Sequence, residues 1–106
     1  MSKPSAPREL VDYYSAGKPL GCELGADPFV CEFWPEHELA QLNLDYQVGD
    51  LAPGFFGFAS NGAGEMFAFS PSGEIVCLPF VGMEPSAASS VAPSWATFVG
   101  LLRNAL

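Results

Sequence analysis

A glycine-rich stretch is the first candidate for chemistry in this sequence. Asn61-Gly62-Ala63-Gly64 precedes an apolar run, as a phosphate-binding loop can. A dinucleotide-binding loop places a third glycine three residues after the second and leads into a helix, but Phe67 holds that position and a strand pattern follows. A P-loop needs Gly-Lys followed by Ser or Thr, and no lysine lies nearby. Because Asn-Gly readily supplies positive φ, we expect a hairpin turn and no bound nucleotide.

The single histidine is the second candidate. His37-Glu38 matches the opening of the zinc motif H-E-x-x-H, but Gln41 stands where the second histidine ligand must be. One histidine also offers only one base for a Ser-His-Asp arrangement, and Ser60 lacks the G-x-S-x-G context of a nucleophile. We therefore expect His37 to be an exposed helix residue and predict no metal site.

Paired carboxylates are the third candidate. Glu36 and Glu38 are two residues apart in a predicted helix, so they point to different faces. The spacing of Asp45 and Asp50 does not place them within the ~5–9 Å that glycoside hydrolysis requires. Because each catalytic arrangement is incomplete, we expect no enzyme activity, no catalytic residue and no cofactor.

The charge of the chain is strongly negative and unevenly distributed. Four Lys and Arg residues face twelve Asp and Glu residues, which gives a net charge of −8. Residues 19–102 contain no Lys or Arg, although they contain ten of the acids. This distribution opposes binding to nucleic acid or to an anionic membrane surface. It favours either a basic protein partner or a surface that serves only solubility.

The length and cysteine usage indicate one domain in a reducing compartment. A chain of 106 residues suits a single domain, residues 1–106. Cys22, Cys31 and Cys77 show no C-x-x-C spacing, so we expect thiols, with Cys31 and Cys77 buried as small apolar side chains. No apolar stretch approaches ~20 residues, and residues 1–4 do not resemble a signal peptide, so we expect a cytoplasmic protein.

Periodicity and turn residues predict three helices and four strands. The helices are expected at 7–16, from Pro35 onward and after a Ser94 cap, and the strands at 28–34, 55–60, 65–70 and 74–80. Segments 20–27, 47–54 and 82–93 are expected to be loops or connections. Consecutive strands joined by short turns predict an α+β fold, a mainly antiparallel sheet of about four to five strands with helices packed against it.

The apolar spacing also predicts which side chains face the core. Apolar stripes are expected from Leu10, Tyr13 and Tyr14 in the first helix and from Leu39, Leu42 and Tyr46 in the second, and the third is expected to turn inward Trp95, Phe98, Val99 and Leu102. In the first strand, one face holds Phe29, Cys31 and Phe33, and the other holds Val30, Glu32 and Trp34.

The order of these motifs resembles the SUKH superfamily, the Smi/Knr-type proteins that include a yeast cell-wall assembly regulator and many bacterial immunity proteins. The resemblance covers roughly residues 29–102, and the N-terminal helical segment is shorter than is usual in the family. The matching residues are Trp34, Pro35, Asn43 and Tyr46, the turn residues Ser60, Asn61, Gly62, Gly64 and Glu65, and Ser94, Trp95 and Phe98 in the last helix.

The resemblance implies a structural glycine turn without a cofactor and a function in protein binding. It implies an immunity protein that neutralises a toxin, often a nuclease, as in toxin–antitoxin pairs. Combined with the charge, it predicts a basic partner bound through acids that include Glu36, Glu38, Asp45, Asp50, Glu65 and Glu84.

Two other functions stay open from the sequence. One is a regulatory or scaffold domain that binds a cellular protein without a toxin, like the eukaryotic relatives. The other is a binder of a small ligand in a cleft lined by Trp34, Phe56 and Trp95, although the inward positions of these aromatics favour core packing.

Overall fold

A single curled sheet organises the molecule in the computed structural model, which describes residues 5–24 and 30–105. Within these ranges the sheet has seven strands in the order β6-β5-β4-β3-β2-β1-β7, and each neighbouring pair is antiparallel. The α+β class and the antiparallel sheet are therefore confirmed, whereas about four to five strands was too few. The strands are β1 Gly21–Leu24, β2 Val30–Phe33, β3 Phe56–Ser60, β4 Glu65–Phe69, β5 Ile75–Pro79, β6 Ser89–Ala92 and β7 Leu102–Ala105.

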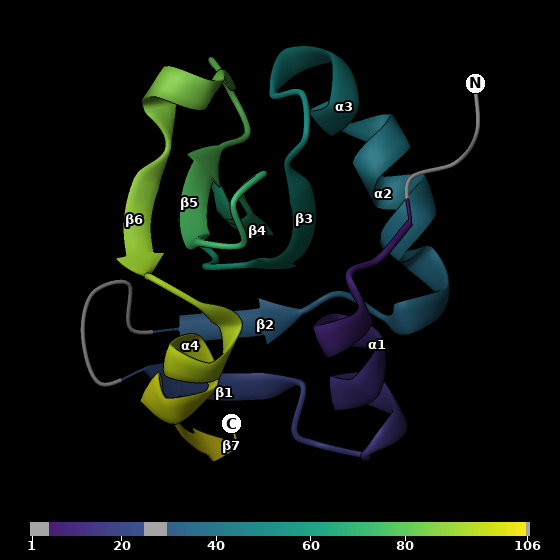
Figure 1. The fold of residues 1–106 in the computed structure, drawn as a ribbon, viewed down its shortest axis with the longest axis vertical. Helices are drawn as coiled ribbons and strands as arrows, with labels where there is room; N and C mark the ends of the chain where they lie inside the picture. The colour runs from purple at the N-terminus through teal and green to yellow at the C-terminus, as the bar shows by residue number, and fades with distance from the viewer. Residues whose placement is uncertain (1–4, 25–29, 106) are drawn as a thin grey trace.

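The sheet bends sharply where β2 meets β3. Only two residue pairs, Glu32 with Ser60 and Phe33 with Ala59, join these strands in register. Beyond this junction β1 and β2 run across the direction of β5 and β6 (Figure 1). The bend encloses apolar side chains from both halves of the sheet.

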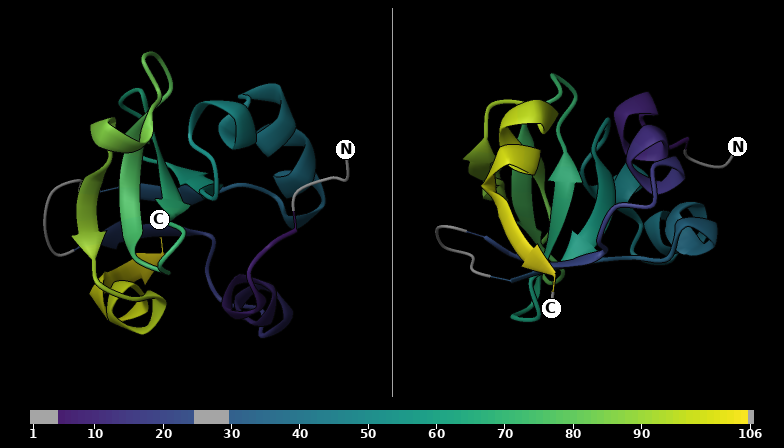
Figure 2. Two further views of the ribbon diagram at one scale, coloured as in Figure 1. Left: turned by 45° about the horizontal axis from the view of Figure 1, so that its top comes forward. Right: turned by 90° about the horizontal axis from the view of Figure 1, so that it is seen from below.

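Helices cover both faces of the curled sheet. They are α1 Arg8–Ser15, α2 Leu39–Asp45, α3 Val48–Leu51 and α4 Trp95–Leu101, with 3₁₀ turns at Glu36–Glu38 and Pro85–Ala87. α1 and α2 lie on the side of the molecule away from β6 (Figure 1, Figure 2). α4 follows β6 and leads directly into β7, so it connects the two edge strands of the sheet.

Local signals explain where α1 and α4 begin and end. Pro7 directly precedes α1, and Gly17 beyond its C-terminus has a φ of +68°, a conformation that glycine adopts cheaply. Ser94 caps α4 as predicted, because its hydroxyl oxygen accepts a hydrogen bond from the Thr97 N–H at 3.2 Å.

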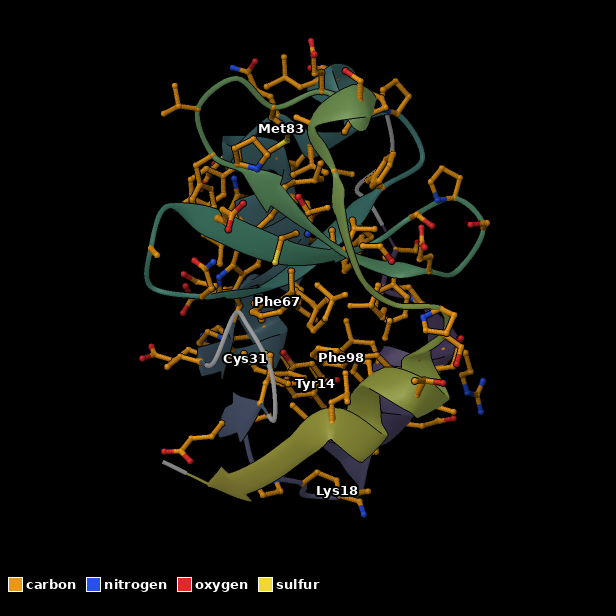
Figure 3. The ribbon with its side chains drawn as sticks, turned by 90° about the vertical axis from the view of Figure 1, so that its left-hand side faces the viewer. Tyr14, Lys18, Cys31, Phe67, Met83 and Phe98 are labelled. Atoms are coloured by element: carbon orange, nitrogen blue, oxygen red, sulfur yellow. The ribbon has the colours of Figure 1, made fainter. Side chains whose placement is uncertain are left out.

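Aromatic side chains form the centre of the core. Phe58, Phe67 and Phe98 are fully buried, and the ring centroids of Phe67 and Phe98 are 5.6 Å apart. Figure 3 shows Phe98 of α4 in the interior of the molecule, in the same part of the view as Tyr14 and Cys31. The predicted burial of Cys31, Cys77 and Leu10 is confirmed.

Three segments predicted to lack regular structure contain strands or a helix, so these predictions were wrong. Segment 20–27 contains β1, which pairs with β2 and β7. Segment 47–54 contains α3, and segment 82–93 contains a 3₁₀ turn and β6. β1 and β6 consist largely of small and polar residues, so their pairing depends on a neighbouring strand and not on an apolar pattern.

Two predicted core positions are also corrected. Leu102 was assigned to the last helix, but the helix ends at Leu101, and Leu102 begins β7 and is half-buried. Tyr46 was assigned to the buried face of the second helix, but it is 40% exposed beyond the C-terminus of α2. Phe29 lies outside the described residues.

Candidate functional site

The glycine loop is a hairpin turn, as predicted. Gly62 and Gly64 have φ angles of +74° and +89°, and the turn joins β3 to β4. Its backbone N–H groups bond within the turn: Gly62 N–H donates to the Ser60 hydroxyl at 3.0 Å, and the Ala63 N–H donates to the Asn61 side-chain oxygen at 2.8 Å. Since these donors are already used, they do not form a cradle for phosphate.

The Asn61 side chain completes this turn. Its oxygen also accepts from the Glu65 N–H at 3.2 Å, and its amide donates to the Glu65 carboxylate at 2.9 Å. The second bond holds Glu65, one of the six predicted partner-binding acids, in a half-buried position against the turn.

Asn43 proves to be a structural residue that joins α2 to β3. It is 2% exposed. Its amide donates to the backbone oxygens of Leu39 at 2.8 Å and Gly57 at 2.9 Å, and its side-chain oxygen accepts from the Gly57 N–H at 2.8 Å. A side chain on Gly57 would meet Met66 and Trp34, so glycine leaves the space that these two side chains occupy.

The aromatic residues considered for a ligand cleft contribute to the packed interior. Trp34 and Phe56 are buried, and Trp95 is half-buried with its ring against Phe58 and Phe69 at centroid distances of 5.5 and 5.2 Å. Core packing therefore explains these three positions, as the sequence analysis favoured.

Tyr14 holds α1 against the end of β2. Its hydroxyl donates a hydrogen bond to the backbone oxygen of Trp34. Burial of the ring, followed by the nearby Glu36 carboxylate, raises the pKa of the Tyr14 hydroxyl above its ordinary value. The hydroxyl therefore remains a protonated donor at neutral pH and does not act as a base.

His37 is exposed, as predicted, and lies in the 3₁₀ turn before α2. Its Nε2 atom is 3.5 Å from a carboxylate oxygen of the adjacent Glu38. Over residues 5–24 and 30–105, no group of three or more potential metal ligands is found.

The six predicted partner-binding acids fall into two groups. Four of them lie on the continuous segment 36–51: Glu36 and Glu38 on the 3₁₀ turn, Asp45 at the end of α2 and Asp50 in α3, all exposed. The other two lie near the end of the β4–β5 hairpin where β4 begins and β5 ends: half-buried Glu65 begins β4 and pairs with Pro79, and exposed Glu84 precedes the second 3₁₀ turn.

Five of these six carboxylates have no ion-pair partner among the described side chains; Glu38 lies beside His37. Among the described side chains the ion pairs are Arg8 with Asp12 at 3.2 Å and His37 with Glu38 at 3.5 Å. Neutral groups donate to three of the others: Gln41 to Asp45 at 2.8 Å, Asn61 to Glu65 at 2.9 Å and Ser86 to Glu84 at 2.7 Å. Such bonds orient the carboxylates without cancelling their charge.

Lys18 lies far from one part of this acidic surface. Lys18 lies at the opposite end of the molecule from Met83, the residue before Glu84 (Figure 3). Lys18 therefore does not neutralise the charge of Glu84.

An aromatic pair of exposed Tyr46 and half-buried Phe80 lies beside Asp45, and sequence reasoning missed it. The Tyr46 ring contacts Phe80, with centroids 4.7 Å apart, and also the buried Trp34, at 5.9 Å. Val81, the next residue, is 90% exposed. The available signal was the apolar run continuing past Pro79 to Val81, immediately before Gly82.

A comparison of the chain with protein-family models gave no match, and a comparison with curated protein sequences gave none either. The SUKH resemblance therefore stays a prediction based on the motif residues. In the part of the chain that the structure describes, no helix is both long and apolar enough to cross a membrane.

Proposed function

We propose that this chain is a cytoplasmic protein-binding module of the SUKH immunity type, which neutralises a basic toxin domain of the nuclease class. The observation that carries the proposal is the group of four exposed carboxylates on segment 36–51, within a chain that has no Lys or Arg from 19 to 102. A nuclease holds a phosphate backbone and therefore presents a positive cleft. An inhibitor that covers such a cleft needs the opposite charge.

The positions of the resemblance residues support the SUKH part of the proposal. Five of them have structural roles: Asn43 links α2 to β3, Trp34 and Phe98 are buried aromatics, and Gly62 and Gly64 form the turn. These roles fit a family whose shared residues maintain the fold while its surface differs among members. The partner surface would then be set by the acids and not by the motif.

Co-expression tests the function. The chain would be expressed together with candidate toxin domains encoded beside its gene, and growth would be measured. We expect rescue by the native chain and weaker rescue by a variant with Asp45→Asn and Asp50→Asn, since both acids are exposed.

The matched control removes the same charge elsewhere. Glu9→Gln with Glu23→Gln changes two exposed acids outside the proposed surface, one in α1 and one in β1. We expect this double variant to rescue growth as well as the native chain does. Absence of rescue by the native chain with every neighbouring toxin candidate would defeat the immunity function.

A further inference from the structure

The Tyr46–Phe80 pair presents aromatic surface at the junction of two elements. Tyr46 follows the C-terminus of α2, and Phe80 follows β5. Their centroids are 4.7 Å apart with the planes inclined by 41°, and Tyr46 remains 40% exposed. The Tyr46 ring also stacks on the buried Trp34 ring, with their centroids 5.9 Å apart and their planes inclined by 28°. This contact restricts the orientation of the exposed ring.

An exposed carboxylate and an exposed apolar side chain are adjacent in sequence to the two rings of this pair. Asp45 directly precedes Tyr46 in sequence and is exposed. The Phe80 N–H donates to the Gly64 backbone oxygen at 3.0 Å, and Glu65 pairs with Pro79, so the Glu65 backbone lies at the same end of β4 and β5 as Phe80. Val81, the residue after Phe80, is 90% exposed.

From this arrangement we infer that Tyr46, Phe80 and Val81 form an anchor site for an arginine side chain of a basic protein partner. The inference rests on the proposed function and deepens it, since it names the contact that charge steering alone does not supply. A cation is attracted to the negative face of an aromatic ring, and a planar guanidinium also stacks on it.

Charge complementarity selects this occupant. The exposed Asp45 carboxylate, on the residue before Tyr46, and the net charge of −8 favour a cation over an acidic side chain. The chain has no Lys or Arg between 19 and 102 that would occupy the rings from a neighbouring position. Val81 and Phe80 can contact the methylene groups of the arginine, because long charged side chains cover apolar surface with their stems.

A titration followed by NMR tests the anchor without the toxin. The probe is the peptide acetyl-Gly-Arg-Gly-Arg-Gly-amide, added to the full chain, and the matched probe replaces both arginines by citrulline, which is similar in shape but uncharged. We expect saturable shifts in the ring signals of Tyr46 and Phe80 and the methyl signals of Val81 with the arginine peptide alone. Shifts confined to residues outside these three, or no saturable shift, would overturn the anchor.

Variants locate the contribution of each group. Tyr46→Leu keeps apolar contact with Trp34 but removes the ring, and we expect about five- to tenfold weaker peptide binding. Val81→Ser, at a position 90% exposed and so harmless to folding, should weaken binding about two- to threefold. Leu51→Ser is the control, because the exposed fraction of Leu51, 42%, is close to that of Tyr46, 40%, but Leu51 lies in α3. The peptide affinity of this variant should equal that of the native chain.

The two proposals fail separately. Arginine-specific binding that survives in both Tyr46→Leu and Val81→Ser would overturn the anchor, whatever the growth experiment shows. Localised arginine binding together with absent growth rescue would support the anchor and count against the immunity function alone.

Discussion

At the residue scale, the buried amide of Asn43 makes two hydrogen bonds that link helix α2 to strand β3. Both bonds are to Gly57, one to its N–H and one to its backbone oxygen. Buried backbone groups that lose their partners cost much more than an exposed hydrogen bond contributes. Asn43 is therefore a position where a change without loss of volume should still destabilise the fold.

We expect Asn43→Leu to lower the free energy of unfolding, because it leaves the two Gly57 groups without partners at a cost of about 1–3 kcal/mol each. Urea unfolding would measure the change. Gln41→Leu is the control: Gln41 lies on the same helix but is exposed, and its amide bonds only to Asp45 among the side chains described. Equal stability of the Asn43 and Gln41 variants would contradict the structural role of Asn43.

The turn glycines give a second prediction at this scale. Gly64→Val should destabilise the protein by about 1 kcal/mol or more, because φ is +89° there and a β-branched residue is strained in that region. A Cβ at Gly64 would meet no atom within 4 Å, so the cost would come from the backbone alone.

Ala63→Val serves as the comparison for Gly64→Val, since Ala63 is an exposed residue of the same turn without positive φ. It should change the melting temperature much less. Equal stability of Gly64→Val and the native chain would show that the turn accommodates a side chain by changing its conformation.

At the element scale, α4 closes the core and connects the two edges of the sheet. Phe98 is fully buried and its ring contacts Phe58, Phe67 and Trp95 at centroid distances of 5.7, 5.6 and 5.5 Å. The helix is only seven residues long, so packing and the Ser94 cap must hold it in place.

Phe98→Ala should therefore cost about 3–5 kcal/mol through lost burial and the cavity that it leaves. Because small domains have a total stability of about 5–15 kcal/mol, we expect a large fall in melting temperature or no folded protein. Val99→Ala, at a half-buried position in the same helix, should cost less. An unchanged melting temperature for Phe98→Ala would mean that α4 is not needed for the core.

At the scale of the whole molecule, the charge determines how a partner approaches. A net charge of −8 on a small domain acts over distances longer than any single contact. Exposed ion pairs contribute only about 0.2–1 kcal/mol each, so charge mainly accelerates encounter and an anchor slows dissociation.

We predict that the association rate constant with an identified toxin partner falls steeply as ionic strength rises. Steered association reaches about 10⁸ M⁻¹s⁻¹ or more at low salt, against about 10⁵–10⁶ M⁻¹s⁻¹ without steering. Stopped-flow mixing at low and high salt would measure the dependence, and the Asp45→Asn, Asp50→Asn variant should show a smaller one. A rate that does not respond to ionic strength would assign the acids to solubility.

The sequence by itself determined the elements whose signals are local. Proline and glycine mark the ends of α1, Ser94 marks the start of α4, and the turns at 61–64 and 71–73 join alternating runs into the meander β3–β4–β5. The exposure of five of the six proposed acids also follows from sequence, because a charged side chain without a partner stays in water.

Tertiary structure alone decided the remaining elements and the aromatic surface. The backbone hydrogen bonds of β1, β6 and β7 depend on the neighbouring strand. The residues of these three strands show no apolar alternation from which the sequence would predict a strand. Asn43 is buried because Gly57 comes close enough to bond with it. Tyr46 lies beyond the end of α2 and is exposed. Its ring contacts that of Phe80, which is 34 residues later in the sequence, and no local pattern predicts a contact over that separation.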